Sequence, residues 1–235
     1  MEQELFRQNP YLKTLETRVI GKLGDGLILD ETIFYPEGGG QPGDMGMLFG
    51  MDGSYLPIVN TLKTPEGILH ITDQVNNKIT LGDNVKIEVD WERRYKHMRM
   101  HTALHILCSL VKGAVTGGSI GITKSRLDFD IPGERPEKES LTSKLMEIVL
   151  ADYPVTTSWI TDQELEANPS LVRTMSVKPP KGSGHIRMVR IGADIDFQPC
   201  GGTHVKSTGE IGKIKIGKIE NKGKQNRRIN VTWAD

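Results

Sequence analysis

Residues 15–90 carry short runs in which apolar and polar positions alternate. Such runs are GLILDETIFY at 26–35, GILHIT at 67–72 and NVKIEVD at 84–90. A period of two is typical of a strand with one buried face. Because the runs are short, closely spaced and separated by glycine, proline and aspartate, they predict a small β-barrel or curled sheet.

The pattern changes at Trp91. The stretch WERRYKHMRMHTALHILCSLVKGA, residues 91–114, has no proline and has no glycine before Gly113. Its apolar positions recur at helical spacing, which predicts one long helix with a buried stripe at Met100, Leu104, Leu107 and Val111. We therefore expect a domain boundary near residue 90, with domains at 1–90 and 91–235.

Downstream of this helix, strand-like and helix-like segments follow one another without an internal repeat. Helices are predicted at 138–153 and 162–171, and strands at 126–131, 155–160, 185–192, 194–199, 210–221 and 227–233. The last four strands are expected to complete a single sheet with turns at glycines. The predicted class is α+β, with an N-terminal small β-barrel followed by an α+β domain.

Composition limits the class of protein and the cellular compartment to which this chain can belong. Of the 235 residues 37% are hydrophobic, enough for a core, and no apolar run approaches the roughly 20 residues that span a bilayer. The N-terminal residues lack an apolar signal-peptide block, so we expect a cytoplasmic protein that does not bind membranes. With only Cys108 and Cys200, no disulfide is expected in a reducing compartment. No obligate protein partner is evident.

Charge is balanced overall, at thirty acidic and thirty basic residues, but unevenly distributed. The C-terminal segment is basic, and so is the start of the long helix. Two basic runs on a neutral chain indicate contacts with a polyanion, although a solvated charged face is the default explanation for either run. The densest candidates are Lys222, Lys224, Arg227 and Arg228, with Arg93, Arg94 and Arg99.

The segment QPCGGTHV, residues 198–205, suggests metal binding. Cys200 and His204 are separated by two glycines and a threonine, a spacing that favours a turn. A thiolate and an imidazole brought together by a turn can supply two ligands to Zn²⁺. Further ligands must then come from elsewhere in the chain.

The long helix offers these ligands in HTALH. His101 and His105 are four residues apart, so they lie on the same helix face and can share one metal ion. His97, four residues before His101, leaves the pairs 97/101 and 101/105 both possible from spacing alone. Cys108 is a further possible donor on the same stripe. His70 and His185, without companion donors, are expected to be ordinary structural or surface residues.

Several of these segments, in order, resemble the editing domain of alanyl-tRNA synthetase and the free-standing alanyl-tRNA editing proteins. The segments are HTALH, RLDFD at 126–130, QPCGGTHVKSTGEIG at 198–212 and RRI at 227–229, and FYPEGGGQPGDMG at 34–46 extends the match into the barrel. The resemblance implies one zinc ion bound by His101, His105, Cys200 and His204, which then form the catalytic site. It makes residues 91–235 a zinc-binding deacylase domain.

The resemblance further implies a trans-acting hydrolase of mischarged tRNA(Ala), chiefly Ser-tRNA(Ala) and secondarily Gly-tRNA(Ala). Four protein ligands would favour an anchoring metal, whereas three would leave a position for an activated water. Because no glutamate follows the first histidine of HTALH, the base of the HExxH proteases is missing. We expect the metal or the substrate itself to activate the water.

The pocket must accept serine and reject alanine, and size exclusion alone discriminates by only about 10–200-fold. A group that recognises the serine hydroxyl is therefore expected. The candidates are Thr116 and Ser119, from a predicted VTGGSIG turn, and Thr203 from the metal-bearing turn. Small hydroxyl residues also populate glycine turns for backbone reasons alone.

The GGGQPGD segment most simply forms a tight turn, since no lysine or following helix supports phosphate binding. The resemblance adds a role in holding or screening the tRNA acceptor end, with Gly39, Gly40 and Gln41 as contacts. Two alternative functions stay open. One is a deacylase for another mischarged tRNA such as Ser-tRNA(Thr), and the other is a zinc-stabilised RNA-binding module without catalysis.

Overall fold

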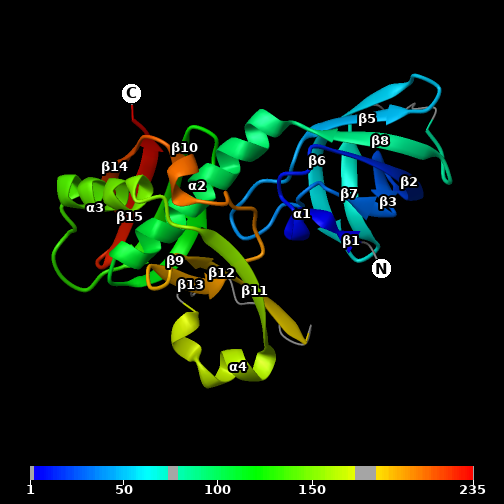
Figure 1. Cartoon of the computed structure of the whole chain (residues 1–235). Coiled ribbons are helices and arrows are strands. Elements are labelled where there is room, and N and C mark those ends of the chain that lie inside the picture. Colours follow the sequence, from blue (N-terminus) through cyan, green and yellow to red (C-terminus); the bar gives the residue numbers. More distant parts are fainter. Residues whose placement is uncertain (1–2, 74–78, 173–183, 235) are drawn as a thin grey trace. The chain divides into compact units, whose positions relative to one another are not determined.

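The computed structural model describes residues 3–73, 79–172 and 184–234 (Figure 1). The chain forms two compact units, Met1–Tyr95 and Lys96–Asp235. The division falls within a single helix, between Tyr95 and Lys96. Within the described residues, no helix has the length and apolar character needed to cross a membrane.

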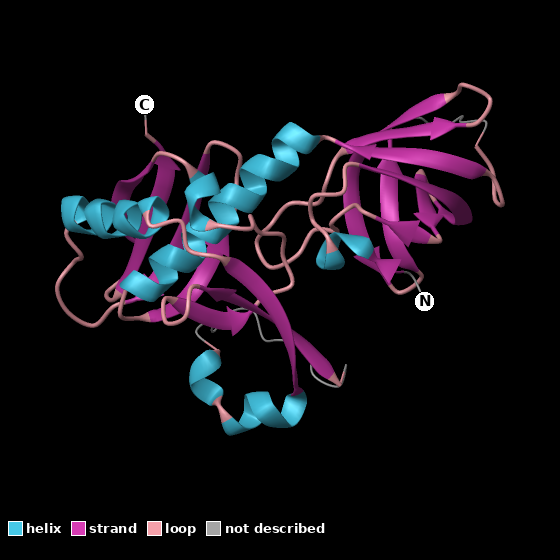
Figure 2. Cartoon of the chain, viewed as in Figure 1, coloured by secondary structure: helices cyan, strands magenta, loops and turns pink. Residues whose placement is uncertain are grey.

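The first unit is built on a closed antiparallel β-barrel, as the alternating runs predict (Figure 2). Around the barrel the order is β2 (Thr14–Leu23), β3 (Gly26–Leu29), β7 (Gly67–Thr72), β6 (Tyr55–Thr64), β5 (Gly46–Gly50) and β8 (Asn84–Val89), which returns to β2. Strand β8 shows why the pattern works, since Val85, Ile87 and Val89 are buried and the residues between them are exposed. A short parallel pair of β1 (Gln3–Glu4) and β4 (Glu31–Thr32) and helix α1 (Leu5–Gln8) complete the unit.

The glycine-rich segment forms the tight turn that its composition favours. Gly38 and Gln41 exchange two backbone hydrogen bonds of 3.1 and 2.9 Å. Between them, Gly39 and Gly40 have φ angles of 58° and 82°, which glycine adopts without the strain that other residues incur. Gly39 and Gly40 are exposed, whereas the side chain of Gln41 is buried.

The prediction that Arg94 contacts a polyanion is wrong. Its side chain is fully buried in the first unit, where Nε donates to both carboxylate oxygens of Asp44 at 2.9 and 2.8 Å. Its other nitrogens donate to the carbonyls of Pro10 and Ile33 at 3.1 and 2.6 Å. Neighbouring Arg93 donates to the carbonyl of Gly43 at 2.8 Å. Arg94 is buried because it pairs with the buried carboxylate of Asp44, and the local sequence gives no sign of this pairing.

The second unit contains most of helix α2 (Trp91–Leu110), which starts at Trp91 as predicted but ends four residues before the predicted end at residue 114, because Ala114 already belongs to a strand. From Met100 to Cys108 every residue is buried, so the helix is covered on all sides and not along one stripe. Its N-terminus is capped by Asp90, whose carboxylate accepts from the backbone N–H of Arg93 at 3.0 Å.

The prediction of a single sheet in this unit is wrong, because the strands form two sheets. The four-stranded sheet has the order β14 (Ile214–Asn221), β15 (Asn226–Trp233), β10 (Lys124–Asp130) and β9 (Ala114–Ser119), and the three-stranded sheet has the order β11 (Val155–Thr161), β12 (His185–Ile191) and β13 (Asp196–Pro199). Both are antiparallel. The remaining elements are α3 (Lys138–Leu150), α4 (Asp162–Ala167) and the short helices η1 (Pro169–Leu171) and η2 (Thr208–Ile211).

The predicted turn at VTGGSIG is also wrong, since its first residues belong to strand β9. Gly117 and Gly118 pair with Asp128 and Leu127 of β10. A Cβ atom on Gly118 would lie 3.0 Å from the Leu127 side chain, which is tighter than ordinary packing. The glycines therefore permit close approach within a sheet and not a reversal of the chain.

Candidate metal centre

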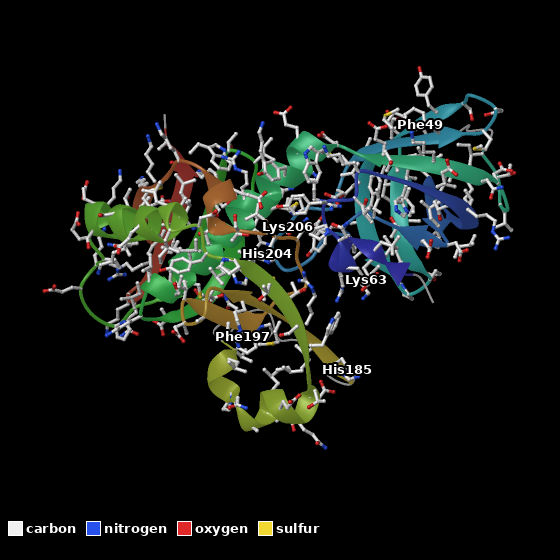
Figure 3. The ribbon with its side chains drawn as sticks, in the orientation of Figure 1. Phe49, Lys63, His185, Phe197, His204 and Lys206 are labelled. Carbon is white, nitrogen blue, oxygen red and sulfur yellow. The ribbon has the colours of Figure 1, made fainter. Side chains whose placement is uncertain are left out.

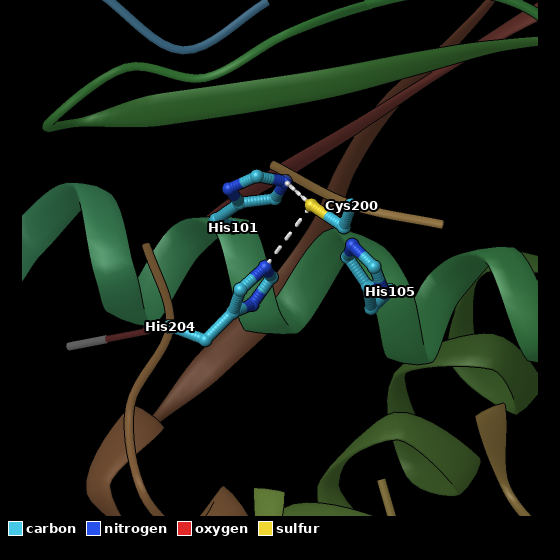
Figure 4. A group of neighbouring side chains, drawn as sticks. All are labelled: His101, His105, Cys200 and His204. Atoms are coloured by element: carbon cyan, nitrogen blue, oxygen red, sulfur yellow. Dashed lines mark hydrogen bonds between the residues drawn. The ribbon is translucent and has the colours of Figure 1, made fainter. Parts of the chain in front are cut away.

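Four side chains from distant parts of the second unit converge on one point (Figure 4). His101 and His105 lie one turn apart on α2, and Cys200 and His204 lie in the segment that follows β13. One ligand atom of each lies within 4.8 Å of those of the other three. Cys200 Sγ is 3.5 Å from His101 Nε2 and 3.3 Å from His204 Nε2. The group could therefore hold a metal ion.

Of the two histidine pairs that spacing left open, the structure brings 101 and 105 to the cluster. Neither His97 nor Cys108 belongs to this group, although both are buried on the same helix. His70 and His185 also lie elsewhere, as expected: His70 is buried in the barrel and His185 is exposed at the start of β12 (Figure 3).

The ring of His105 is oriented by a carboxylate. Its Nδ1 lies 2.8 Å from Asp196 Oδ2, and Gln198 Nε2 donates to the same oxygen at 3.0 Å. Because a carboxylate only accepts hydrogen bonds, Nδ1 carries a proton, and Nε2 is the nitrogen that faces the cluster. Asp196 and Gln198 alternate along β13, so both side chains leave the strand on the same face.

The ring of His204 is oriented by a hydroxyl. Thr102 Oγ1 donates to the carbonyl of Met98 at 2.9 Å. His204 Nδ1 lies 3.1 Å from Thr102 Oγ1. Since the hydroxyl proton is already donated to Met98, the hydroxyl accepts from His204 Nδ1–H. His204 therefore also presents Nε2, the atom near Cys200.

The turn that carries Cys200 is held by Arg187 of β12. Its Nη1 donates to the carbonyls of Cys200 and Gly202 at 2.8 and 3.0 Å, and the Cys200 N–H donates to the Arg187 carbonyl at 3.0 Å. Arg187 is buried, while Gly201 is exposed. The guanidinium thus replaces the helix or strand that would otherwise satisfy these carbonyls.

The electrostatics of the cluster favour a thiolate. Burial alone would raise the pKa of the Cys200 thiol, but its electrostatic interactions with His101 and His204 and its hydrogen bonds with His101 and His105 outweigh burial and hold that pKa well below its usual value. Burial holds the pKa of His204 well below 6.5. Burial would also lower the pKa of His105, but its hydrogen bonds to Asp196 and Cys200 raise it to about 10. The cluster therefore offers a thiolate at Cys200 and a neutral imidazole at His204, and a metal ion that binds would displace the second proton of the His105 ring.

Sequence reasoning missed Asp196, Gln198, Thr102 and Arg187. A signal existed for the first two, since Asp196 and Gln198 alternate on a predicted strand immediately before Cys200. Thr102 and Arg187 gave no such signal, because they reach the centre only through the packing of α2 and β12 against the turn.

The predicted hydroxyl-recognising residues differ in setting. Thr203 is fully buried between the two ligands of its turn. Thr116 is half-buried, donates to the Asp128 carbonyl at 3.2 Å and accepts from Asn226 Nδ2 at 2.9 Å. Ser119 is exposed at the end of β9.

The two C-terminal arginines are half-buried on β15. Arg228 makes two hydrogen bonds of 2.8 and 2.9 Å to the carboxylate of Asp128, and Arg227 donates to the carbonyls of Gly223 and Lys224 in the preceding turn. Arg99 donates to the carbonyl of Ile211 at 2.8 Å.

Family profiles connect both units with tRNA synthetases. Residues 7–93 match the profile described as tRNA synthetases class II (A), and residues 186–230 match the threonyl and alanyl tRNA synthetase second additional domain. The second match contains both Cys200 and His204. The fold and centre thus define a class of proteins built from synthetase domains.

Similarity to individual proteins is more specific. The alanyl-tRNA editing protein AlaX-M of Methanosarcina acetivorans is 36% identical, covering 100% of both chains. AlaX-M of Saccharolobus solfataricus is 36% identical, covering 99% of both chains. An alanine–tRNA ligase of Pyrobaculum arsenaticum is 36% identical over 93% of this chain, which corresponds to 25% of the ligase. The chain belongs to the family of alanyl-tRNA editing proteins, which are deacylating hydrolases.

Proposed function

We propose that this protein hydrolyses the ester of mischarged tRNA(Ala), chiefly Ser-tRNA(Ala) and secondarily Gly-tRNA(Ala). The observation that carries the proposal is the His₃Cys centre, in a chain that matches editing proteins along its whole length. Since aminoacyl-tRNAs are made and used in the cytoplasm, we place the protein there. In this scheme residues 1–90 form a barrel domain and residues 91–235 the deacylase domain.

Zn²⁺ is the ion that best fits the centre. With Zn–S of about 2.3 Å and Zn–N of about 2.0–2.1 Å, tetrahedral ligands lie about 3.5 Å apart. The two Cys200 distances, 3.5 and 3.3 Å, agree with this spacing. Three imidazoles and a thiolate are the donors that zinc prefers, and Asp196 supplies the carboxylate partner usual for a zinc-bound histidine.

The four donors would hold the ion while the surrounding chain orients the ester. When bound, zinc would supply a Lewis acid that polarises the substrate or lowers the pKa of a bound water. Cys200 is half-buried and Gly201 is exposed, so the ester would reach the metal centre from solvent at this turn. An aminoacyl ester is already activated, and its positioning supplies much of the rate acceleration.

Selection of serine would depend on Thr116, Ser119 or Thr203. Because the Thr116 hydroxyl already donates its proton to Asp128, it would act as an acceptor for the serine hydroxyl. Changing the responsible residue, as in Thr116→Val, Ser119→Ala or Thr203→Val, should slow deacylation of the seryl ester more than of the glycyl ester. Equal losses on both esters for all three variants would place recognition elsewhere.

The remaining contacts would serve the RNA. The exposed Gly39 and Gly40 are proposed to touch the acceptor end, and Arg227 and Arg228 to contact phosphates. The burial of Gln41 supports a role in shaping this turn more than a direct contact. Each of these assignments is testable separately from the hydrolysis itself.

The decisive experiment incubates the protein with four labelled substrates: Ser-tRNA(Ala), Gly-tRNA(Ala), Ala-tRNA(Ala) and Ser-tRNA(Thr). We expect loss of the first, slower loss of the second and retention of the others. Loss of Ser-tRNA(Thr) at the same rate would favour a deacylase of another specificity. Retention of all four would favour the non-catalytic RNA-binding alternative.

A matched pair of cysteine variants tests the centre in the same assay. Cys200→Ala should lose zinc by elemental analysis and lose more than about 100-fold of the activity, since even removal of an outer partner costs 10–100-fold. Cys108→Ala, which changes a buried cysteine outside the cluster, should keep both. Full zinc occupancy in Cys200→Ala would refute its assignment as a ligand.

A further inference from the structure

Trp159 is an exposed tryptophan on the small sheet that carries part of the metal centre. It lies on β11, which is an edge strand of the three-stranded sheet (Figure 1). The residue is 55% exposed. Within the described part of the chain, no hydrogen bond or ring contact involves its indole. Single exposed apolar residues are common, so exposure alone assigns no role. Its position on the sheet is what matters.

Strand register places Trp159 on the face that meets the centre. Trp159 lies directly opposite Arg187 of β12, so the two side chains leave the sheet on the same side. Two residues along β12, Val189 lies on that side as well and pairs with Gln198 of β13. Gln198 and its neighbour on this face, Asp196, hold His105. One sheet face therefore runs from the metal centre to Trp159.

The opposite face is used differently. Phe197 (Figure 3) alternates with Asp196 and Gln198 and so lies on the other side of β13. There the guanidinium of Arg190 stacks over its ring, 3.8 Å from the ring centroid. That aromatic ring is covered by its own chain. On the face that contains Asp196 and Gln198, the indole of Trp159 is open to a partner.

We infer that Trp159 is the stacking platform for the terminal adenine of the aminoacyl-tRNA. This inference rests on the proposed function, because an ester that reacts at the metal centre is attached to the ribose of the last nucleotide. The adenine must then lie within about one nucleoside of the centre. Strands β11 and β13 are two strand spacings apart, about 10 Å, a distance that a ribose, a base and the reach of two side chains span.

The chemistry of tryptophan suits this partner. Single-stranded RNA ends are commonly recognised by stacking of unpaired bases on aromatic rings. Such stacking tolerates any base because each has a flat face, so it positions the 3′ end without choosing the tRNA. Arg187 connects the platform to the reaction, because it neighbours Trp159 and also holds the carbonyls of Cys200 and Gly202.

The first test measures kinetics with two substrates. Trp159→Ala should lower kcat/KM for Ser-tRNA(Ala) about 5- to 150-fold, which corresponds to the 1–3 kcal/mol of one base stack. Trp159→Phe should lower kcat/KM for Ser-tRNA(Ala) by a smaller factor, because phenylalanine keeps an aromatic ring. A serine methyl ester, which has no adenine, should be hydrolysed equally by all three proteins. Leu150→Ala, another exposed apolar residue of this unit at 77%, is the matched control and should be unchanged on both substrates.

The second test does not depend on hydrolysis. The trinucleotide CCA, not acylated, is titrated into the zinc-loaded protein while the indole N–H resonances of Trp91, Trp159 and Trp233 are followed by NMR. The Trp159 resonance, assigned with Trp159→Phe, should shift, and the other two should not.

The outcomes separate the two proposals. A shift of Trp159 without deacylation of any mischarged tRNA would overturn the proposed function and keep the platform. Deacylation with no shift of Trp159 and no kinetic loss in Trp159→Ala would overturn the platform and keep the function. An equal loss on the methyl ester would show that the variant disturbs the centre itself, which would also overturn the platform.

Discussion

Both compact units bury histidines, and the two sets of rings find partners in different ways. In the barrel, His70 Nε2 lies 2.7 Å from Thr32 Oγ1 and Nδ1 lies 3.1 Å from the Leu27 carbonyl, so the fold satisfies both nitrogens. In the second unit, His105 and His204 each use Nδ1 for a neighbouring side chain and turn Nε2 toward three other donors. A buried histidine with both nitrogens satisfied is structural, whereas one with a nitrogen directed at other donors marks a binding centre.

The buried charged side chains of the two units also differ in what they contact. Arg94 and Asp44 neutralise each other inside the first unit and lie in no cluster of metal donors. In the second unit the buried carboxylate of Asp196 is directed at a candidate metal ligand. We therefore expect substitutions in the first unit to change stability and substitutions around the centre to change metal affinity.

The largest expected effect is on stability, in Arg94→Met. Removing the guanidinium leaves Asp44 buried without its cation, which typically costs about 3–5 kcal/mol. The free energy of unfolding from guanidinium titration should fall by that amount, while zinc bound per folded chain stays the same. Arg93→Met, at a half-buried neighbour, should cost much less. A similar loss in both variants would contradict a special role for the buried pair.

The barrel histidine should make stability depend on pH. Burial lowers the pKa of His70 from 6.5 to about 4, so between these values the unfolded chain binds a proton that the folded chain does not. Stability is then present above pH 6.5 and is lost as the pH falls toward 4, by about 3 kcal/mol at 1.36 kcal/mol per unit.

The measurement compares wild type with His70→Gln in denaturant titrations at neutral pH and near pH 4. The wild type should lose about 3 kcal/mol more than the variant over this interval. Identical pH dependence in the two proteins would show that the folded state accommodates the charged ring.

At the centre, Asp196→Asn tests the orientation of His105. Asparagine keeps the shape and loses the charge, so zinc affinity measured by chelator competition should fall about 10–100-fold. Thr102→Val, which removes the neutral partner of His204, should have a smaller effect. Unfolding stability of the first unit should not change in either variant. If both variants bind zinc as wild type does, the hydrogen bonds to these rings are incidental.

The smallest expected effect concerns RNA binding. Changing Arg227 and Arg228 together to alanine should flatten the slope of log affinity against log salt by roughly one to two units. Arg228 should contribute less, because Asp128 already occupies its guanidinium. A double alanine variant of Lys138 and Lys144, exposed on α3, is the control. An unchanged slope in R227A/R228A would show that the basic strand is only a solvated face.

Local pattern was sufficient where neighbours in sequence are also neighbours in space. The alternation in residues 84–90 determined the buried face of β8, and the absence of proline and glycine before Gly113 determined most of α2. The pairs His101/His105 and Cys200/His204 were recognisable because a helical turn and a tight turn bring residues four apart together.

Tertiary structure decided what depends on partners distant in the chain. The separation into two sheets could not be predicted, because any strand of suitable pattern can pair with several others. The burial of Arg94 depended on Asp44, fifty residues away, and the choice of His105 over His97 depended on where the turn at Cys200 packs. Local periodicity specifies which side of an element is apolar, and only the folded chain specifies what that side meets.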